Sequence, residues 1–325
     1  MTGAYIDKDY VYAVARIRSA ELKLFDKAVM DQLIQAHSAD ECIDLLLEKD
    51  WGNGSRNADE ILSTEREKIW ELIDELIPDR QIFSIFRLPN DYSNLKAAIK
   101  ESVMDYDYPG IYIQEANIDP MLIRQAVKER NYQELPDEMA NLAAYAHSLF
   151  LKTRDGQLCD IVVDKACIEA ILKAGAESGN EFIEMYAELV AVSSNIKTAV
   201  RAANTGKDRS FLDKAICDCP TLPAEGLIKG ALSGIDGICS YLMSTDYSEA
   251  VGELKKSPAA FERWCDNLII GKIRSELYNS FGIGPLAAYV LARENEIKSV
   301  RIILSGKQNG FSEDVIRERV RETYV

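Results

Sequence analysis

The chain has 325 residues, of which 47% are hydrophobic and 28% charged, and its formal net charge is −15. These values are typical of a globular protein and exclude wholesale disorder, and the length suits two or three lobes better than one core. The acidic balance argues against binding to nucleic acid, whose phosphates repel negative charge.

Membrane insertion and export are not expected from the sequence. No apolar run approaches the roughly 18 residues that a membrane-spanning helix needs. The first residues include acids and lack a basic stretch followed by an apolar one, so we expect no secretory signal and a cytoplasmic location. Seven cysteines form an odd, scattered set, which favours reduced thiols over a disulfide framework.

In the first eighty residues, apolar side chains recur at helical spacing in three stretches. The first predicted helix runs from 9 to about 27. The second begins at Ser38, which forms a capping box with Glu41, and ends at the Gly-rich turn 51–54. The third covers about 57–77, and Pro78 should end it.

The middle of the chain is also predicted to be helical. After a connector at 83–89 and a turn at 106–110, only 111–113 and 159–163 suggest short strands. Glycines at 226–252 indicate either close-packed helices or a mobile loop. Another short helix should open at Ser210 and break at Cys217–Pro220. The remaining predicted helices cover about 91–103, 120–130, 136–153, 164–173 and 180–204.

Three further helices are predicted near the C-terminus. Ser257 and Pro258 should start the first, since Ser is a good N-cap and Pro fits the first turn. The second is long, begins at Pro285 and should end near Gly306. A short last helix should begin at Ser312 and reach the C-terminus.

Three similar segments lie at equal spacing. Asn94-Leu-Lys, Asn195-Ile-Lys and Glu296-Ile-Lys are each 101 residues apart, since 195 − 94 and 296 − 195 are both 101. Equal spacing predicts an internal triplication with repeats at roughly 1–112, 113–214 and 215–325 within one module, 1–325.

Nucleotide-binding motifs are only approximated. Gly206-Lys207 and Gly306-Lys307 resemble the end of a P-loop, but the first Gly and the final Ser/Thr of that motif are missing. We therefore interpret both glycines as helix ends. Gly282-x-Gly284-x-x-Ala287 has the letters of a dinucleotide fingerprint but follows a helix instead of a strand.

Metal and catalytic constellations are also missing from the sequence. His37 and His147 are in unrelated segments, which argues against a histidine-based metal site. Cys217-x-Cys219 provides half of a metal site without a matching pair elsewhere, so ordinary cysteines are the favoured interpretation. We expect no catalytic residue, no cofactor and no metal.

One motif near the N-terminus contains Tyr12, Arg16, Arg18 and Glu21, and another begins at Pro285 and runs to Lys307. These motifs resemble one known family, namely the C subunits of the V/A-type rotary ATPases and ATP synthases, the counterparts of the d subunit in the eukaryotic vacuolar enzyme. A closing motif covers 316–325. The resemblance extends over the whole chain. The motif residues, which we expect to be structural or interface positions, are Tyr12, Arg16, Arg18, Glu21, Pro285, Tyr289, Glu294, Glu296, Arg301, Gly306 and Lys307.

The resemblance implies an all-α, three-lobed funnel of helical bundles with approximate three-fold internal repetition. It implies a non-catalytic central-stalk subunit that links the rotary axle to the membrane rotor ring and transmits torque for ATP-coupled proton or sodium transport. Its partners would be the axle subunits and the ring. It would lie at the cytoplasmic face of the membrane and contact the membrane only through the ring.

Two other classes remain as alternatives. A helical scaffold or interaction protein unrelated to rotary ATPases would also bury a core between repeats, but the usual repeat is only about 20–50 residues long. An all-helical enzyme would need a catalytic constellation. Residues 265–325 carry nine Lys/Arg against eight Asp/Glu, so the acidic charge is in the rest of the chain. We expect this nearly neutral segment to pack internally or on a partner.

Overall fold

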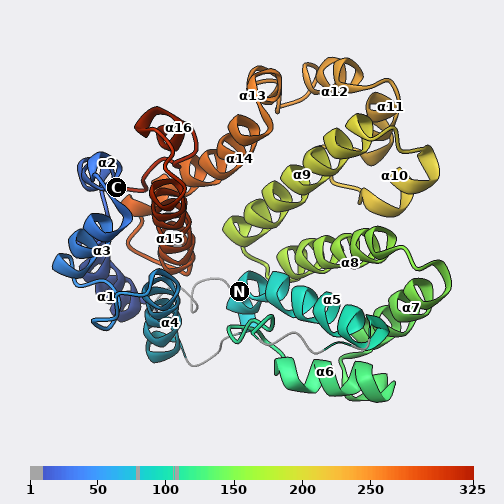
Figure 1. Cartoon of the computed structure of the whole chain (residues 1–325), viewed down its shortest axis with the longest axis horizontal. Helices are drawn as coiled ribbons and strands as arrows, with labels where there is room; N and C mark the ends of the chain where they lie inside the picture. The colour runs from blue at the N-terminus through green and yellow to red at the C-terminus, as the bar shows by residue number, and fades with distance from the viewer. Residues whose placement is uncertain (1–9, 78–80, 105, 107–109) are drawn as a thin grey trace, which may run out of the picture. The chain divides into compact units, whose positions relative to one another are not determined.

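The computed structural model describes residues 10–77, 81–104, 106 and 110–325. Within these residues every regular element is a helix and there is no strand, which confirms the all-α prediction (Figure 1). The chain forms two compact units, unit 1 with residues 1–80 and 252–325, and unit 2 with residues 81–251. The three-fold repeat and its boundaries remain a prediction.

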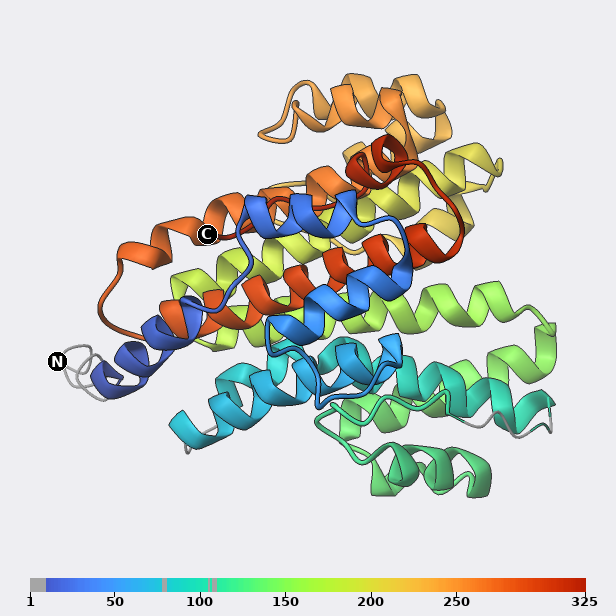
Figure 2. The ribbon, with the colours of Figure 1, turned by 60° about the vertical axis from the view of Figure 1, so that its left-hand side comes forward.

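Unit 1 is built around α15 (Gly284–Gln308), which packs against elements from both ends of the chain. Figures 1 and 2 show this red helix beside the blue N-terminal helices. Most of its residues are buried, including the polar Arg293, Glu296 and Ser299. The other elements are α1 (Val11–Glu21), α2 (Lys27–Gln35), α3 (Ala39–Glu48), α4 (Ala58–Leu76), α14 (Pro258–Ile273), η3 (Arg274–Tyr278) and α16 (Glu313–Arg317).

Side-chain caps set several helix starts in unit 1. The Ser38 hydroxyl accepts from the Glu41 N–H at 3.1 Å, as the capping box predicts, while the Glu41 carboxylate accepts from His37 N–H instead of from Ser38. Asn57 caps α4 and Ser257 caps α14. The predicted stop at Pro78 lies outside the described residues.

Two predicted helix ends in unit 1 were wrong. α1 ends at Glu21, not near residue 27, because Asp26 caps α2 by accepting from the Val29 N–H at 2.9 Å. α15 ends at Gln308, close to the predicted end near Gly306, but Gly306 itself lies inside the helix against Ile316 and does not end it. The last helix stops at Arg317, well before the C-terminus.

Unit 2 is a succession of packed helices in which α8 (Gly156–Glu177) contacts both α5 (Leu88–Met104) and α9 (Glu181–Asn204). The green and yellow helices of Figure 1 show this order. The connector before α5 contains η1 (Gln81–Phe86). The remaining elements are α6 (Pro120–Glu129), η2 (Tyr132–Glu134), α7 (Asp137–Thr153), α10 (Arg209–Ala215), α11 (Ala224–Leu232) and α12 (Ile235–Leu242), while α13 (Ala250–Lys256) lies where the units divide.

The strand-like runs in unit 2 are not strands. Residues 159–163 belong to α8, and 111–113 form an irregular segment that bonds to Asn94. The predicted cap at Ser210 was wrong, since Asp208, two residues earlier, accepts from the Phe211 N–H at 2.9 Å and caps α10. The predicted turn at 106–110 lies mostly outside the described residues.

The Gly-rich region consists of close-packed helices. α11 and α12 cross at Gly230 and Gly237, where a Cβ added to Gly237 would lie 2.4 Å from the Gly230 carbonyl oxygen. Only a residue without a side chain fits at such a crossing. Gly234 joins the two helices with a φ of +86°, a left-handed conformation that favours glycine.

The three equally spaced sequence markers share one structural role. Asn94, Asn195 and Glu296 are buried polar residues in the long helices α5, α9 and α15. Asn94 bonds both the N–H and the C=O of Ile113, and Asn195 does the same with Cys217. Glu296 accepts the N–H of Phe25. Each marker therefore ties an irregular segment to a long helix.

Candidate functional site

The N-terminal and C-terminal motifs meet inside unit 1. Arg18 and Glu21 on α1 form an ion pair at 2.7 Å, and the Glu21 side chain is nearly buried. Arg18 also donates to the backbone oxygens of Glu276 and Asn279, which precede α15. α1 is thereby fixed to the connection that leads into α15.

A buried ionic cluster joins α15 to α4. The Arg293 guanidinium lies between Glu296 on its own helix and Glu65 on α4, with 2.5 Å between Arg293 Nη2 and Glu65 Oε2. Arg293 is also 5.0 Å from the ring centroid of Trp51, a distance typical of a cation–π contact. The exposed fraction is 6% for Arg293, 4% for Glu296 and 3% for Glu65, so all three charges are buried.

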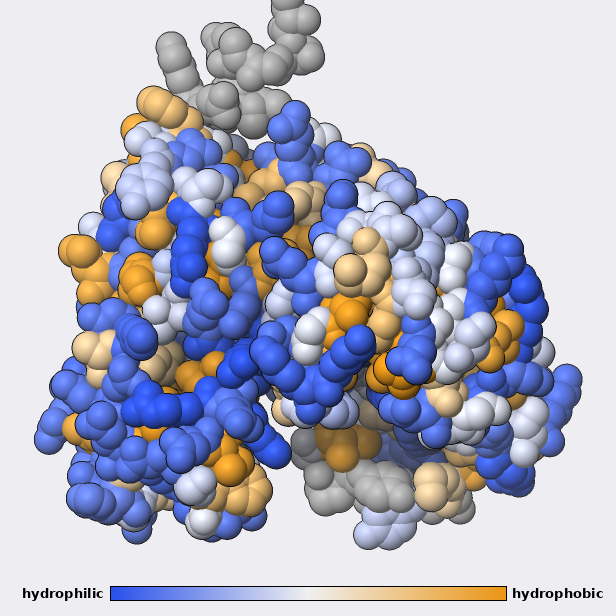
Figure 3. All heavy atoms as spheres, turned by 90° about the horizontal axis from the view of Figure 1, so that it is seen from above, coloured by the Kyte–Doolittle hydropathy of each residue, from blue (hydrophilic) through white to orange (hydrophobic). Residues whose placement is uncertain are grey.

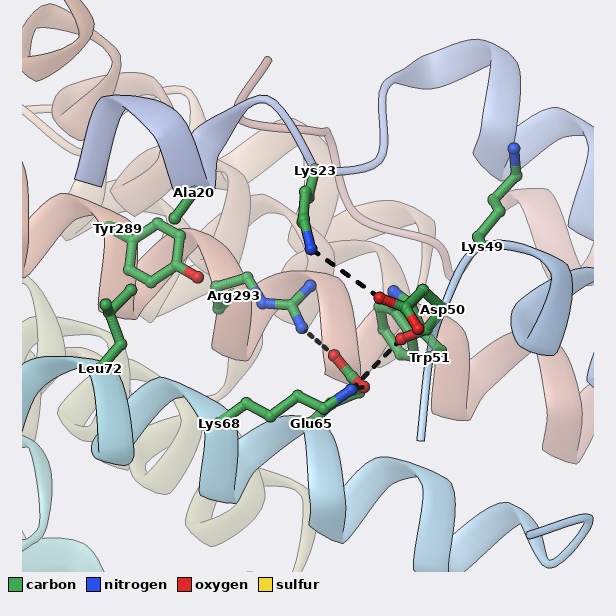
Figure 4. Close-up of a pocket in the computed structure, with 10 residues that line it drawn as sticks. All are labelled: Ala20, Lys23, Lys49, Asp50, Trp51, Glu65, Lys68, Leu72, Tyr289 and Arg293. Carbon is green, nitrogen blue, oxygen red and sulfur yellow. Dashed lines mark hydrogen bonds and ion pairs between the residues drawn. The ribbon is translucent and has the colours of Figure 1, made fainter. Parts of the chain in front are cut away.

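The surrounding hydrogen bonds complete the cluster (Figure 4). Glu65 accepts from the Gly52 N–H at 2.7 Å and from Lys68 at 2.7 Å, so its carboxylate is well satisfied. Burial of the Arg293 guanidinium lowers its pKa, but Glu296, Tyr289 and Glu65 together outweigh this effect and raise the pKa above its usual value. Arg293 is therefore a permanent cation between two carboxylates.

A pocket of about 250 Å³ opens beside this cluster. Lys23 and Asp50 pair across it at 3.8 Å and are both largely exposed, as Figure 4 shows. Its lining residues are Ala20, Lys23, Lys49, Asp50, Trp51, Glu65, Lys68, Leu72, Tyr289 and Arg293.

The chemistry of the pocket is that of a structural ion cluster. Its two carboxylates are paired with lysine or arginine, and the lining contains no histidine or thiol that could act as a base or nucleophile. Burial raises the pKa of the Tyr289 hydroxyl, so this group stays protonated. Within the part of the chain that the structure describes, no three His, Cys, Asp or Glu side chains cluster to hold a metal ion.

Several other motif residues connect α1 or α15 to α4 at the surface. Arg16 pairs with Glu75 at 3.2 Å, Glu294 with Arg66 at 3.0 Å and Arg301 with Asp59 at 3.0 Å. These pairs are partly exposed, so each contributes at most about 1 kcal/mol. The motif residues thus gather around the same helices as the buried cluster.

Of the remaining motif residues, Pro285, Tyr289 and Gly306 are buried in α15, whereas Lys307 and Tyr12 are not. Pro285 and Tyr289 are buried in α15, and Gly306 lets Ile316 approach so closely that an added Cβ would lie 2.7 Å from it. Lys307 is half-buried near Cys42. Tyr12 is 67% exposed and is not part of the cluster.

Glu65 and Arg293 were missed as site residues in the sequence. Glu65 lies between Leu62 and Ile69 on the apolar face of α4, and Arg293 lies on the apolar stripe of α15. A charge at an apolar position signals a buried partner, because an isolated buried charge is costly. The sequence therefore indicates that Glu65 and Arg293 each have a buried partner, but it does not identify that partner.

On the face shown in Figure 3, hydrophobic residues are scattered among hydrophilic ones instead of forming a continuous band. Among the residues that the structure describes, no helix is long and apolar enough to cross a bilayer.

Comparison with known proteins agrees with the resemblance seen in the motifs. Residues 13–319 match the family model of the ATP synthase (C/AC39) subunit. The chain is 24% identical to the C subunit of the V-type sodium ATPase of Enterococcus hirae, over 95% of this chain and 97% of the relative. It is 25% identical to the C subunit of the A-type ATP synthase of Methanocaldococcus jannaschii, over 95% and 85% respectively. The chain therefore belongs to the ATP synthase (C/AC39) subunit family.

Proposed function

We propose that this chain is a non-catalytic central-stalk subunit of a V/A-type ATPase or ATP synthase. It links the rotary axle to the membrane rotor ring and transmits torque for ATP-coupled ion transport. The observation that carries the proposal is the family match over residues 13–319, together with relatives named as the C subunits of V-type and A-type enzymes.

The interior of unit 1 supports a mechanical role. A part that transmits torque must resist deformation, and close-packed helices are stiff. α15 is buried along most of its length and is linked to α4 by the Arg293 cluster and by two outer ion pairs. These links oppose sliding between the two helices.

The proposed location and partners follow from the same function. The subunit lies at the cytoplasmic face of the membrane, where it contacts the axle subunits and the ring. Its contact with the membrane is indirect, through the ring.

Purification of the native complex tests the proposal. The chain is expressed with an affinity tag in its own organism, membranes are solubilised in mild detergent, and the eluate is analysed by mass spectrometry. We expect the axle subunits and the ring protein to co-purify in fixed ratio. Recovery of neither would overturn the proposal, and recovery of an unrelated set of proteins would favour the helical scaffold.

A second measurement addresses the non-catalytic assignment. The isolated chain is incubated with Mg²⁺ and ATP, and phosphate release is followed. We expect no turnover above that of a heat-denatured sample. The same chain, added to a complex depleted of it, should restore ATP-driven ion transport.

A further inference from the structure

Cys217 and Cys219 lie around a single side chain in unit 2. Asn195 Nδ2 donates to Cys219 Sγ at 3.2 Å, and the Cys217 thiol donates to Asn195 Oδ1 at 3.5 Å. The same carboxamide bonds the N–H and the C=O of Cys217, at 3.2 and 2.7 Å. Both sulfur atoms therefore contact the same carboxamide.

The two thiols are electronically unlike. The Cys219 thiol donates to the Cys217 backbone oxygen at 3.9 Å. The neighbouring Cys219 side chain lowers the pKa of Cys217 below its usual value, although burial raises it. The Cys217 side chain and burial both raise the pKa of Cys219. Burial raises the pKa of Cys159 to about 11 and that of Cys167 to about 12. Cys217 thus differs from Cys159, Cys167 and Cys219 in the direction of its pKa shift, which favours deprotonation at this sulfur relative to the other three.

A reagent can approach Cys217 from one side. Cys217 and Asn195 line a groove of about 420 Å³ whose other walls come from α8, α9 and α10. Both cysteines are only 2% exposed, and of the two only Cys217 lines the groove, so the groove is the route to Cys217. Residues 216–219 have no regular secondary structure, and no helix needs to unwind when their backbone adjusts.

We propose that Cys217 and Cys219 form a redox-active dithiol that small-molecule disulfides convert to an intramolecular disulfide. The Cys217 thiolate attacks one sulfur of the reagent, forms a mixed disulfide and releases one thiolate. The Cys219 sulfur, on losing its proton, attacks the Cys217 sulfur and expels the second thiolate. Two protein thiols lose two electrons and two protons, and the reagent is reduced to two thiols.

The geometry favours internal closure over a lasting adduct. The second thiol is two residues from the first and contacts both its backbone oxygen and the same Asn195 carboxamide, so its effective concentration is high. Oxidation removes both S–H donors but leaves the bonds from Asn195 to the Cys217 backbone intact. The proposal is independent of the rotary-ATPase assignment, because it concerns the chemistry of this chain alone.

Oxidation of the full chain with oxidised glutathione tests the proposal. The reduced protein is treated at neutral pH, the remaining thiols are blocked with N-ethylmaleimide, and peptides are analysed by mass spectrometry. We expect the peptide with Cys217 and Cys219 to lose two hydrogen atoms first. Its oxidation should be about tenfold or more faster than adduct formation at any other cysteine, because thiolate fraction controls the rate.

Serine variants separate the two roles. Cys219→Ser should accumulate the glutathione adduct on Cys217, since no second thiol can expel it. Cys217→Ser should abolish the fast reaction. The matched control Cys159→Ser/Cys167→Ser removes two buried thiols of α8 and should leave the fast reaction unchanged.

Phenylarsine oxide gives a second readout on the unsubstituted chain, because a trivalent arsenical bridges two adjacent thiols. We expect one equivalent to bind at Cys217 and Cys219 and to block the disulfide. The proposal is overturned if this pair oxidises no faster than the other cysteines, or if the native chain binds no arsenical.

Discussion

The marker residues of α9 and α15 do the same structural task with different chemistry. On α9, the neutral Asn195 pairs with both backbone groups of Cys217 and needs nothing else. On α15, Glu296 accepts one backbone N–H, from Phe25, and also requires Arg293. Arg293 in turn requires Glu65 on α4. A carboxamide can bond both the N–H and the C=O of a segment by itself, whereas a buried carboxylate also needs a cation to balance its charge.

The difference teaches where a buried charge is useful. A buried ion pair rarely adds net stability over apolar packing, but removing one member is severe because an unpaired charge remains. The cluster makes α15, α4 and the segment at Phe25 depend on one another. Asn94 and Asn195 each join only one helix and one segment.

The largest expected effect comes from Arg293→Met, which leaves the buried Glu296 without a cation and Glu65 with Lys68 alone. We expect the free energy of unfolding to fall by about 3–5 kcal/mol, as for other broken buried pairs. Chemical denaturation measures the loss, and hydrogen exchange should place the increased opening in α4 and α15.

The matched control is Arg66→Met, which removes the partly exposed pair with Glu294 on the same two helices. We expect a loss of at most about 1 kcal/mol. If the two variants lost the same free energy of unfolding, burial of the Arg293 cluster would not increase its contribution to stability. The inferred difference between the Asn195 amide and the ion cluster would then be contradicted.

Local sequence signals predicted most of the fold. Ser38 and Ser257 are side-chain caps, as predicted, and such caps act within one turn of their helix, as the apolar spacing does. α1 was predicted too long because Leu24 and Phe25 continue the helical spacing although the cap at Asp26 requires the chain to leave the helix.

The candidate site could be predicted only in part. The motif residues of α1 and α15 were identified, but Glu65 and Arg293 are 228 positions apart. A single sequence shows that each carries a charge on an apolar face and gives no means of pairing them. Likewise, the spacing of 101 residues found Asn195, while its bonds to Cys217 depend on how the segment after α10 folds back.

Asn195→Ala should have an intermediate effect. It leaves the buried N–H and C=O of Cys217 without a partner, and we expect a loss of about 2 kcal/mol in the free energy of unfolding. Hydrogen exchange should increase at 216–219 while α4 and α15 stay protected. Ser194→Ala, on the neighbouring position of α9, is the control and should change stability by less than about 0.5 kcal/mol. Increased exchange in α4 after Asn195→Ala would contradict the expectation that the bonds between Asn195 and Cys217 act independently of the Arg293 cluster.

The smallest expected effect is a change in how stability depends on pH, which should be seen for Asp266 in unit 1 and not for Asn195 in unit 2. Burial raises the pKa of Asp266 on α14, but Lys298 and Arg321 outweigh burial and hold the pKa below its usual value. The distance from Arg321 Nε to Asp266 Oδ2 is 2.8 Å. A carboxyl group with a lowered folded-state pKa stabilises the fold above its unfolded pKa of about 3.9, and this stabilisation is lost as pH falls through the lowered folded-state value.

Asp266→Asn should therefore cost about 1 kcal/mol at pH 7 and almost nothing near pH 2, so that its acid-unfolding profile is flatter than that of the unsubstituted chain. Denaturant unfolding at several pH values between about 7 and 2 measures the difference. Asp246→Asn, at an exposed position with no ion pair among the described residues, is the charge-matched control and should leave the profile unchanged. The hydrogen bonds between the Asn195 carboxamide and the Cys217 backbone contain no titratable group. Asn195→Ala should therefore lower the free energy of unfolding by the same amount at every pH in this range. If Asn195→Ala gave a flatter acid profile than the unsubstituted chain, the hydrogen bonds between Asn195 and Cys217 would depend on charged groups. If Asp266→Asn gave a profile parallel to that of the unsubstituted chain, the ion pairs of Asp266 would persist in acid.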